Sequence, residues 1–111
     1  MTLDQARKLA LALPEAVESS HMGNPDFRVR NRIFVSFHKN SRPVVKLTLE
    51  QQSIMVGAEP DIFTPVPGGW GNQGWTSIDL KAADTVTMKS ALTTAWRNVA
   101  PKKLVAALEA K

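Results

Sequence analysis

The stretch that decides the fold is residues 27–37, Phe-Arg-Val-Arg-Asn-Arg-Ile-Phe-Val-Ser-Phe. Its first three residues alternate between apolar and charged side chains, as a half-buried strand does. Arg30 and Asn31 then fit a two-residue turn, because asparagine tolerates the left-handed backbone that such turns require. The chain returns through the β-branched and aromatic residues of 32–37, which favour a second strand. The sequence therefore predicts a β-hairpin with arginines around its tip.

Further strands are expected on both sides of this hairpin. A turn signal, Gly23-Asn24-Pro25, separates it from a short candidate strand before it, and a polar loop at residues 38–43 separates it from the next strand. The additional candidates are residues 17–21, 44–47, 62–63 and 76–80. An irregular loop rich in glycine and proline is predicted at residues 64–76. The strands that follow one another closely indicate an antiparallel meander.

Helices are predicted before, within and after the strands. Thr2 with Gln5, and Thr48 with Gln51, have the spacing of a capping box, so each threonine is expected to begin a helix. The predicted helices are residues 3–13, 49–56, 85–99 and a last short helix after Pro101. Helices that bracket an antiparallel meander indicate the α+β class, with the sheet packed against the N-terminal and C-terminal helices.

Length and composition restrict the kinds of protein that this chain can be. A chain of 111 residues is the usual size of one domain, so we expect a single domain over residues 1–111. Cysteine is absent, which excludes disulfides, thiolate nucleophiles and iron–sulfur clusters. The N-terminal stretch has the charges of an amphipathic helix rather than of a signal peptide, and no run of about 20 apolar residues could span a membrane. We expect a cytoplasmic monomer that does not bind membranes.

The positive charge is concentrated in one part of the chain. Between Phe27 and Leu49 there are six basic residues and no acidic residue. The rest of the chain has eight basic and ten acidic residues, so the net charge of +4 comes from this window alone. A local positive field attracts polyanions such as nucleic acid, although a basic surface that only keeps the protein soluble is an alternative.

No catalytic or metal-binding motif is convincing. Gly69-x-Gly71-x-x-Gly74 matches the dinucleotide-binding spacing, but a strand rather than a helix is predicted to follow it, so we reject that motif. His21 and His38 are expected to be structural residues rather than a pair of metal ligands. The acidic residues that could serve acid–base chemistry are expected to be turn and cap residues; these are Asp61, Asp79 and Asp84. We therefore expect neither an enzyme nor a cofactor or metal.

Two tryptophans flank the glycine-rich loop. Trp70 and Trp75 could stack on a nucleic-acid base or line a small-molecule pocket. The alternative is that both rings fold back over the edge of the sheet and complete the core, as large aromatic rings usually do. Trp96 lies on the apolar face of a predicted helix and is expected in the core.

Several segments resemble the MmcQ/YjbR family, in the right order over nearly the whole chain. They are residues 21–29 (HMGNPDFRV), 32–34 (RIF), 74–76 (GWT) and 95–102 (AWRNVAPK). The resemblance implies an α+β fold with an antiparallel sheet in a double-wing arrangement, for which members are often labelled DNA-binding. Members commonly place a glycine–lysine pair at the hairpin tip, where this chain has Asn31-Arg32.

The charge pattern and the resemblance together lead to a functional hypothesis. We predict a DNA-binding protein whose basic β-hairpins contact the phosphate backbone. The predicted contact residues are Arg28, Arg30, Arg32, Lys39, Arg42 and Lys46. The alternative is a small-ligand or protein-interaction module that uses the loop of Trp70 and Trp75. The DNA-binding hypothesis requires the basic side chains of the two neighbouring turns and of the strands beside them to converge on one side of the molecule.

Overall fold

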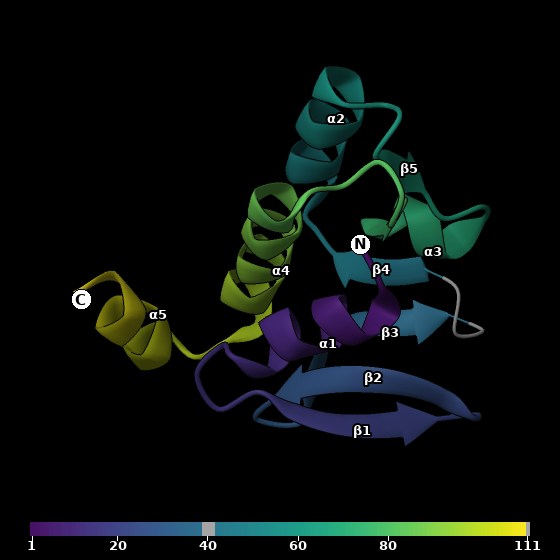
Figure 1. Cartoon of the computed structure of the whole chain (residues 1–111). Helices are drawn as coiled ribbons and strands as arrows, with labels where there is room; N and C mark the ends of the chain where they lie inside the picture. Colours follow the sequence, from purple (N-terminus) through teal and green to yellow (C-terminus); the bar gives the residue numbers. More distant parts are fainter. Residues whose placement is uncertain (39–41, 111) are drawn as a thin grey trace.

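The computed structural model describes residues 1–38 and 42–110. The helices and strands, in chain order, are α1 (Leu3–Leu11), β1 (Val17–His21), β2 (Asn24–Val29), β3 (Arg32–His38), β4 (Arg42–Lys46), α2 (Leu49–Ala58), β5 (Phe63–Pro65), α3 (Gly69–Asn72), β6 (Trp75–Ile78), α4 (Thr85–Val99) and α5 (Lys102–Glu109) (Figure 1). This order confirms the predicted α+β class.

The strands form a single antiparallel sheet in the order β1-β2-β3-β4-β6-β5. The first four strands are neighbours in chain order, so the predicted meander is confirmed for them. The last two are exchanged, because β6 pairs with β4 while β5 takes the outer edge beside β6. The sheet therefore has β1 at one edge and β5 at the other.

The predicted hairpin forms between β2 and β3. Arg30 and Asn31 have φ values of 51° and 67°, as a type I′ turn requires at both central positions. The pairing then shifts by one residue: Phe27 is opposite Val35, Arg28 is opposite Ile33, and Phe34 has no partner in β2. This bulge explains how two consecutive residues, Phe34 and Val35, are both fully buried in a strand, where side chains normally alternate between the two faces.

Several element boundaries differ from the sequence-based expectation. The first turn is Met22-Gly23, both with positive φ, and Asn24 and Pro25 already belong to β2. Proline is tolerated there because Pro25 pairs with β1 alone, at a position beyond the register with β3. The predicted irregular loop contains the short helix α3, and α2 continues to Ala58 instead of ending at Val56.

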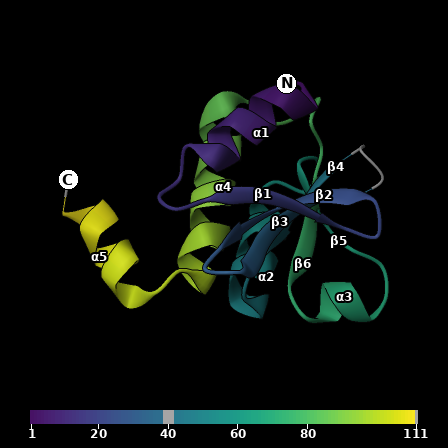
Figure 2. The same ribbon diagram turned by 90° about the horizontal axis from the view of Figure 1, so that it is seen from below.

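Helices α1 and α4 pack on one face of the sheet, as the two views show (Figures 1 and 2). The core between these layers is apolar and includes the fully buried Trp96, as predicted. The Trp96 indole donates a hydrogen bond from Nε1 to the carbonyl of Pro14 at 3.0 Å, which ties α4 to the segment that follows α1. In contrast, α5 has no fully buried residue and extends away from the sheet.

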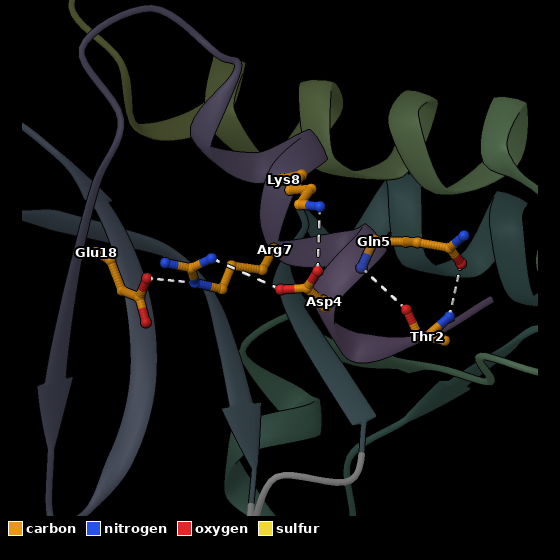
Figure 3. Close-up of polar contacts among 6 residues, drawn as sticks. All are labelled: Thr2, Asp4, Gln5, Arg7, Lys8 and Glu18. Carbon is orange, nitrogen blue, oxygen red and sulfur yellow. Dashed lines mark hydrogen bonds and ion pairs between the residues drawn. The ribbon is translucent and has the colours of Figure 1, made fainter.

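Polar contacts hold the first helix at its N-terminus and in its middle. Thr2 and Gln5 form the predicted capping box, in which each side chain accepts a hydrogen bond from the other residue's backbone N–H (Figure 3). Arg7 lies between Asp4 and Glu18, and its Nε donates to the Glu18 carboxylate at 2.7 Å (Figure 3). This ion pair connects α1 to β1.

Candidate nucleic-acid interface

The basic residues of the two predicted turns lie at opposite ends of the sheet. Arg30 is in the turn between β2 and β3, whereas Arg42 begins β4 opposite His38, at the other end of β3. The seven residues of β3, at about 3.3 Å each, place these ends roughly 20 Å apart. The expectation that the basic side chains of the two turns converge on one side of the molecule is therefore wrong, because a meander puts successive turns at opposite ends of its strands.

Two of these arginines are also neutralised by distant carboxylates. Arg30 donates from Nε and Nη2 to the two oxygens of Glu15, at 2.6 and 3.1 Å. Those hydrogen bonds hold the pKa of Glu15 below its usual value. Arg42 lies 3.6 Å from a carboxylate oxygen of Asp79. Both acids lie outside the acid-free window, so the local count of basic residues overstates the positive field.

Arg28 belongs to a compact cluster around Asp26. The Asp26 side chain is fully buried and accepts from Nε and Nη2 of Arg28, at 2.8 and 3.1 Å. His21 Nδ1 lies 2.9 Å from the same carboxylate. Burial raises the pKa of Asp26, but the contacts from Arg28 and His21 outweigh burial and leave the pKa below its usual value. The cluster is therefore a saturated network, in which Arg28 is already paired.

The other three predicted contact residues have different surroundings. Arg32 is exposed and makes no ion pair with the described residues. Lys39 lies outside the described residues. Lys46, at the end of β4, donates from Nζ to the carbonyl of Gln73 at 2.6 Å and lies 5.4 Å from the centre of the Trp75 ring. Lys46 therefore belongs structurally to the glycine-rich loop rather than to the hairpin tips.

The tryptophans of the loop differ in exposure. Trp70 is 63% exposed, whereas Trp75 is half-buried. Their ring centres are 6.4 Å apart in an edge-to-face arrangement. We define Lys46, Trp70 and Trp75 as the tryptophan platform. The platform brings together one residue of the predicted phosphate-contacting set and both residues of the predicted ligand loop.

The loop that carries the platform is closely packed against its neighbours. A Cβ at Gly71 would lie 1.9 Å from the carbonyl oxygen of Val66, and one at Gly74 would lie 1.9 Å from that of Leu47. Gly74 also has a φ of 101°, a conformation that other residues rarely adopt. Glycine is therefore required at both positions for the loop to reach this packing.

A buried glutamine holds the same loop from beneath, and sequence reasoning missed it. Gln52 of α2 donates from Nε2 to the carbonyls of Gly71 and Trp75, at 3.0 and 3.3 Å, and to Thr76 Oγ1 at 3.0 Å. The sequence did contain a signal for this residue. Gln52 lies four positions before the apolar Val56, and residues four apart lie on the same face of a helix, so Gln52 could be expected to point inward. The exposed position of Trp70 is thus set by a constrained loop.

Two of the three acidic candidates from the sequence make hydrogen bonds to nearby backbone N–H groups. Asp84 caps α4 by accepting from the Thr87 N–H at 2.7 Å, and Asp79 accepts from the Lys81 N–H at 2.8 Å. After the third glycine of the rejected dinucleotide motif the chain enters β6, a strand, as predicted. Among the described residues there is no group of three or more metal-ligating side chains, and no helix that could span a membrane.

Comparison with known proteins identifies a family and a related fold. The model of the YjbR family matches residues 11–98, which include the whole sheet and the tryptophan platform. The crystal structure of the Deinococcus radiodurans protein DR2400, described as a DUF419 domain, superimposes with a TM-score of 0.74 at 18% sequence identity. The similarity covers 92% of this chain and 80% of that chain. No curated protein matches the sequence.

Proposed function

This chain belongs to the YjbR family, and we propose that it is a non-enzymatic protein that binds single-stranded nucleic acid on the tryptophan platform. The observation that carries the proposal is the exposure of Trp70 on a constrained loop. A large apolar ring that is held in water loses the free energy that burial would supply, about 2 kcal/mol or more for an indole. That arrangement is explained if a ligand covers the ring.

Base stacking is the interaction that such a platform offers. Every base has an aromatic face, so one exposed indole can stack on any unpaired base, with about 1–3 kcal/mol per base. The ammonium group of Lys46 lies beside the second indole and can attract the phosphate next to a stacked base. One ring and one cation are a small site, so we expect weak binding with little sequence preference.

Duplex DNA is supported less well than a single strand. Binding to a duplex through phosphates needs several unpaired cations on one surface. Arg28, Arg30 and Arg42 are paired with carboxylates, and the last two lie at opposite ends of the sheet. The DNA-binding label implied by the family resemblance is therefore retained as nucleic-acid binding, but at a different surface from the hairpin arginines.

Fluorescence anisotropy with a labelled single-stranded oligonucleotide tests the proposal, with a duplex of the same length in parallel at low salt. We expect the single strand to bind more tightly, and Trp70→Ala to weaken it about 5- to 150-fold, the equivalent of one lost stack. Val86→Ala is the matched control, because Val86 is also an exposed apolar residue but belongs to α4. Undetectable binding of both nucleic acids, or an unchanged affinity after Trp70→Ala, would overturn the proposal.

A protein or small-ligand partner at the same loop is the second candidate. Leu49 is an exposed apolar residue that follows Thr48, and the backbone of Thr48 lies against Gly74. An exposed apolar side chain next to a backbone segment that contacts the loop favours a partner with its own apolar surface. This candidate predicts that Leu49→Ser weakens binding as much as Trp70→Ala, whereas stacking of nucleic acid on Trp70 does not involve Leu49.

A further inference from the structure

The two edges of the sheet are protected very differently. The β5 edge is three residues long and ends in a proline, two features that discourage pairing with another strand. The β1 edge is five residues long, Val-Glu-Ser-Ser-His, without proline, lysine or arginine, and its register with β2 has no bulge. All five residues of β1 are exposed, and in both views no helix or loop of the described residues covers its outer side (Figures 1 and 2).

We propose that the β1 edge pairs with the β1 edge of a second copy of this chain, antiparallel about a two-fold axis at Ser19. The two-residue turn Met22-Gly23 makes His21 and Asn24 a hydrogen-bonded pair. Hydrogen-bonded pairs alternate along an antiparallel ladder, so the backbone groups of Ser19 also point towards β2. The backbone N–H and C=O groups of Glu18 and Ser20 then point outward and are available to a partner.

This alternation restricts the registers that a second copy can adopt. Residues with outward-pointing backbone groups must face each other, so Glu18 can lie opposite Glu18 or Ser20 of the other copy, but not opposite Ser19. A Glu18–Glu18 register would place like charges directly across the interface, which is unfavourable. The register centred on Ser19 puts Glu18 opposite Ser20 and is the one that pairs all five strand residues.

The side chains agree with this register. Val17, which is 55% exposed, begins β1, and Met22, which is 94% exposed, directly follows its last residue. Antiparallel pairing about Ser19 brings Met22 of one copy next to Ala16 and Val17 of the other, so apolar surface from both ends is covered. The charges of the strand are already balanced within each copy, because Glu18 pairs with Arg7 (Figure 3) and His21 contacts Asp26.

A cysteine cross-link tests the register directly, because the chain has no cysteine of its own. In the proposed dimer the two Ser19 positions are a non-hydrogen-bonded pair with Cα atoms about 4.5 Å apart, within the range of a disulfide. The two Val17 positions are separated by four residues along the strand, about 13 Å. We expect Ser19→Cys to form a disulfide-linked dimer under mild oxidation roughly ten-fold faster than the matched control Val17→Cys.

Sedimentation of the unmodified chain completes the test. We expect the average mass to rise from monomer to dimer with concentration, and Ser20→Pro to keep the chain monomeric. That substitution removes an outward N–H that β2 does not use, and circular dichroism verifies that the variant folds. A monomer at all concentrations together with equal cross-linking rates for Ser19→Cys and Val17→Cys would overturn the proposal. Dimers with equal cross-linking rates, or dimers that survive Ser20→Pro, would overturn it as well, since the interface would lie elsewhere.

Discussion

The hairpin around Arg28 and Arg30 differs from the loop around Trp70 in how side chains with unfavourable surroundings are satisfied. In the hairpin, Arg28 and Arg30 look free in the sequence but are matched by carboxylates, one of which is the fully buried Asp26. In the loop, the Trp70 ring, of a type that is normally buried, is 63% exposed on a backbone that close glycine contacts and Gln52 hold in place. The difference teaches that a concentration of one residue type in the sequence is weaker evidence for a binding surface than a constrained loop that leaves a large side chain uncovered.

The largest expected effect is on the loop side of this comparison. Gly71→Ala should lower the free energy of unfolding by about 3 kcal/mol, because its Cβ would meet a backbone carbonyl that cannot move without shifting the loop. Gly69→Ala is the matched control two residues away, since a Cβ there meets nothing within 4 Å. Urea denaturation measures both. Similar stabilities for the two variants would show that the loop adapts easily, and the contrast with the hairpin would then fail.

On the hairpin side, the largest effect is expected at the buried carboxylate. Asp26→Asn should lower the free energy of unfolding by about 2–3 kcal/mol, because Arg28 loses its charged partner and His21 loses an acceptor. Asp61→Asn is the control, an exposed aspartate for which we expect a change within about 0.5 kcal/mol. Urea denaturation again provides the measurement. An equal response of the two variants would mean that the cluster around Asp26 contributes nothing to stability.

The same cluster predicts a dependence of stability on acid. The pKa of Asp26 is lower in the folded protein than its usual value of 3.8. Its contribution is therefore complete above that value and is lost as the pH falls through the lower, folded-state pKa. Urea midpoints between pH 7 and pH 3 should decline more steeply in the unmodified protein than in Asp26→Asn. Parallel declines would assign the acid sensitivity to other carboxylates.

Local sequence rules predicted most of the elements because the signals for each one lie within a few residues. The turn at Arg30-Asn31 and the helix caps at Thr2, Thr48 and Asp84 are all set by neighbours in the chain. The exchange of β5 and β6 was not predictable in this way, because the order of strands depends on contacts between distant segments. The first turn moved by one residue because Met22 adopts a positive φ that methionine rarely does.

The candidate site was predictable only in part, for the same reason. The two tryptophans and Lys46 could be named, but their meeting depends on the pairing of β4 with β6, which opposes Lys46 and Trp75. The neutralisation of Arg30 depends on Glu15, fifteen residues earlier in the chain, and no local pattern indicates that contact. Counts of charge within a window cannot detect carboxylates that the fold brings in from outside.

The smallest expected effect tests whether the ion pair with Glu15 prevents Arg30 from binding phosphate. Glu15→Gln removes the opposing charge and leaves Arg30 available, so weak binding of duplex DNA at low salt should strengthen, with a salt dependence of log K steeper by at most about 0.9, the value for one phosphate contact. Glu50→Gln is the matched control, because Glu50 is exposed and makes no ion pair with the described residues. Salt-titrated anisotropy measures both variants.

If Glu15→Gln changes nothing while Arg30→Ala weakens binding in the unmodified background, Arg30 already reaches phosphate despite its ion pair. The hairpin would then have to be counted as part of the binding surface, since pairing on an exposed surface is weak enough for a polyanion to displace it.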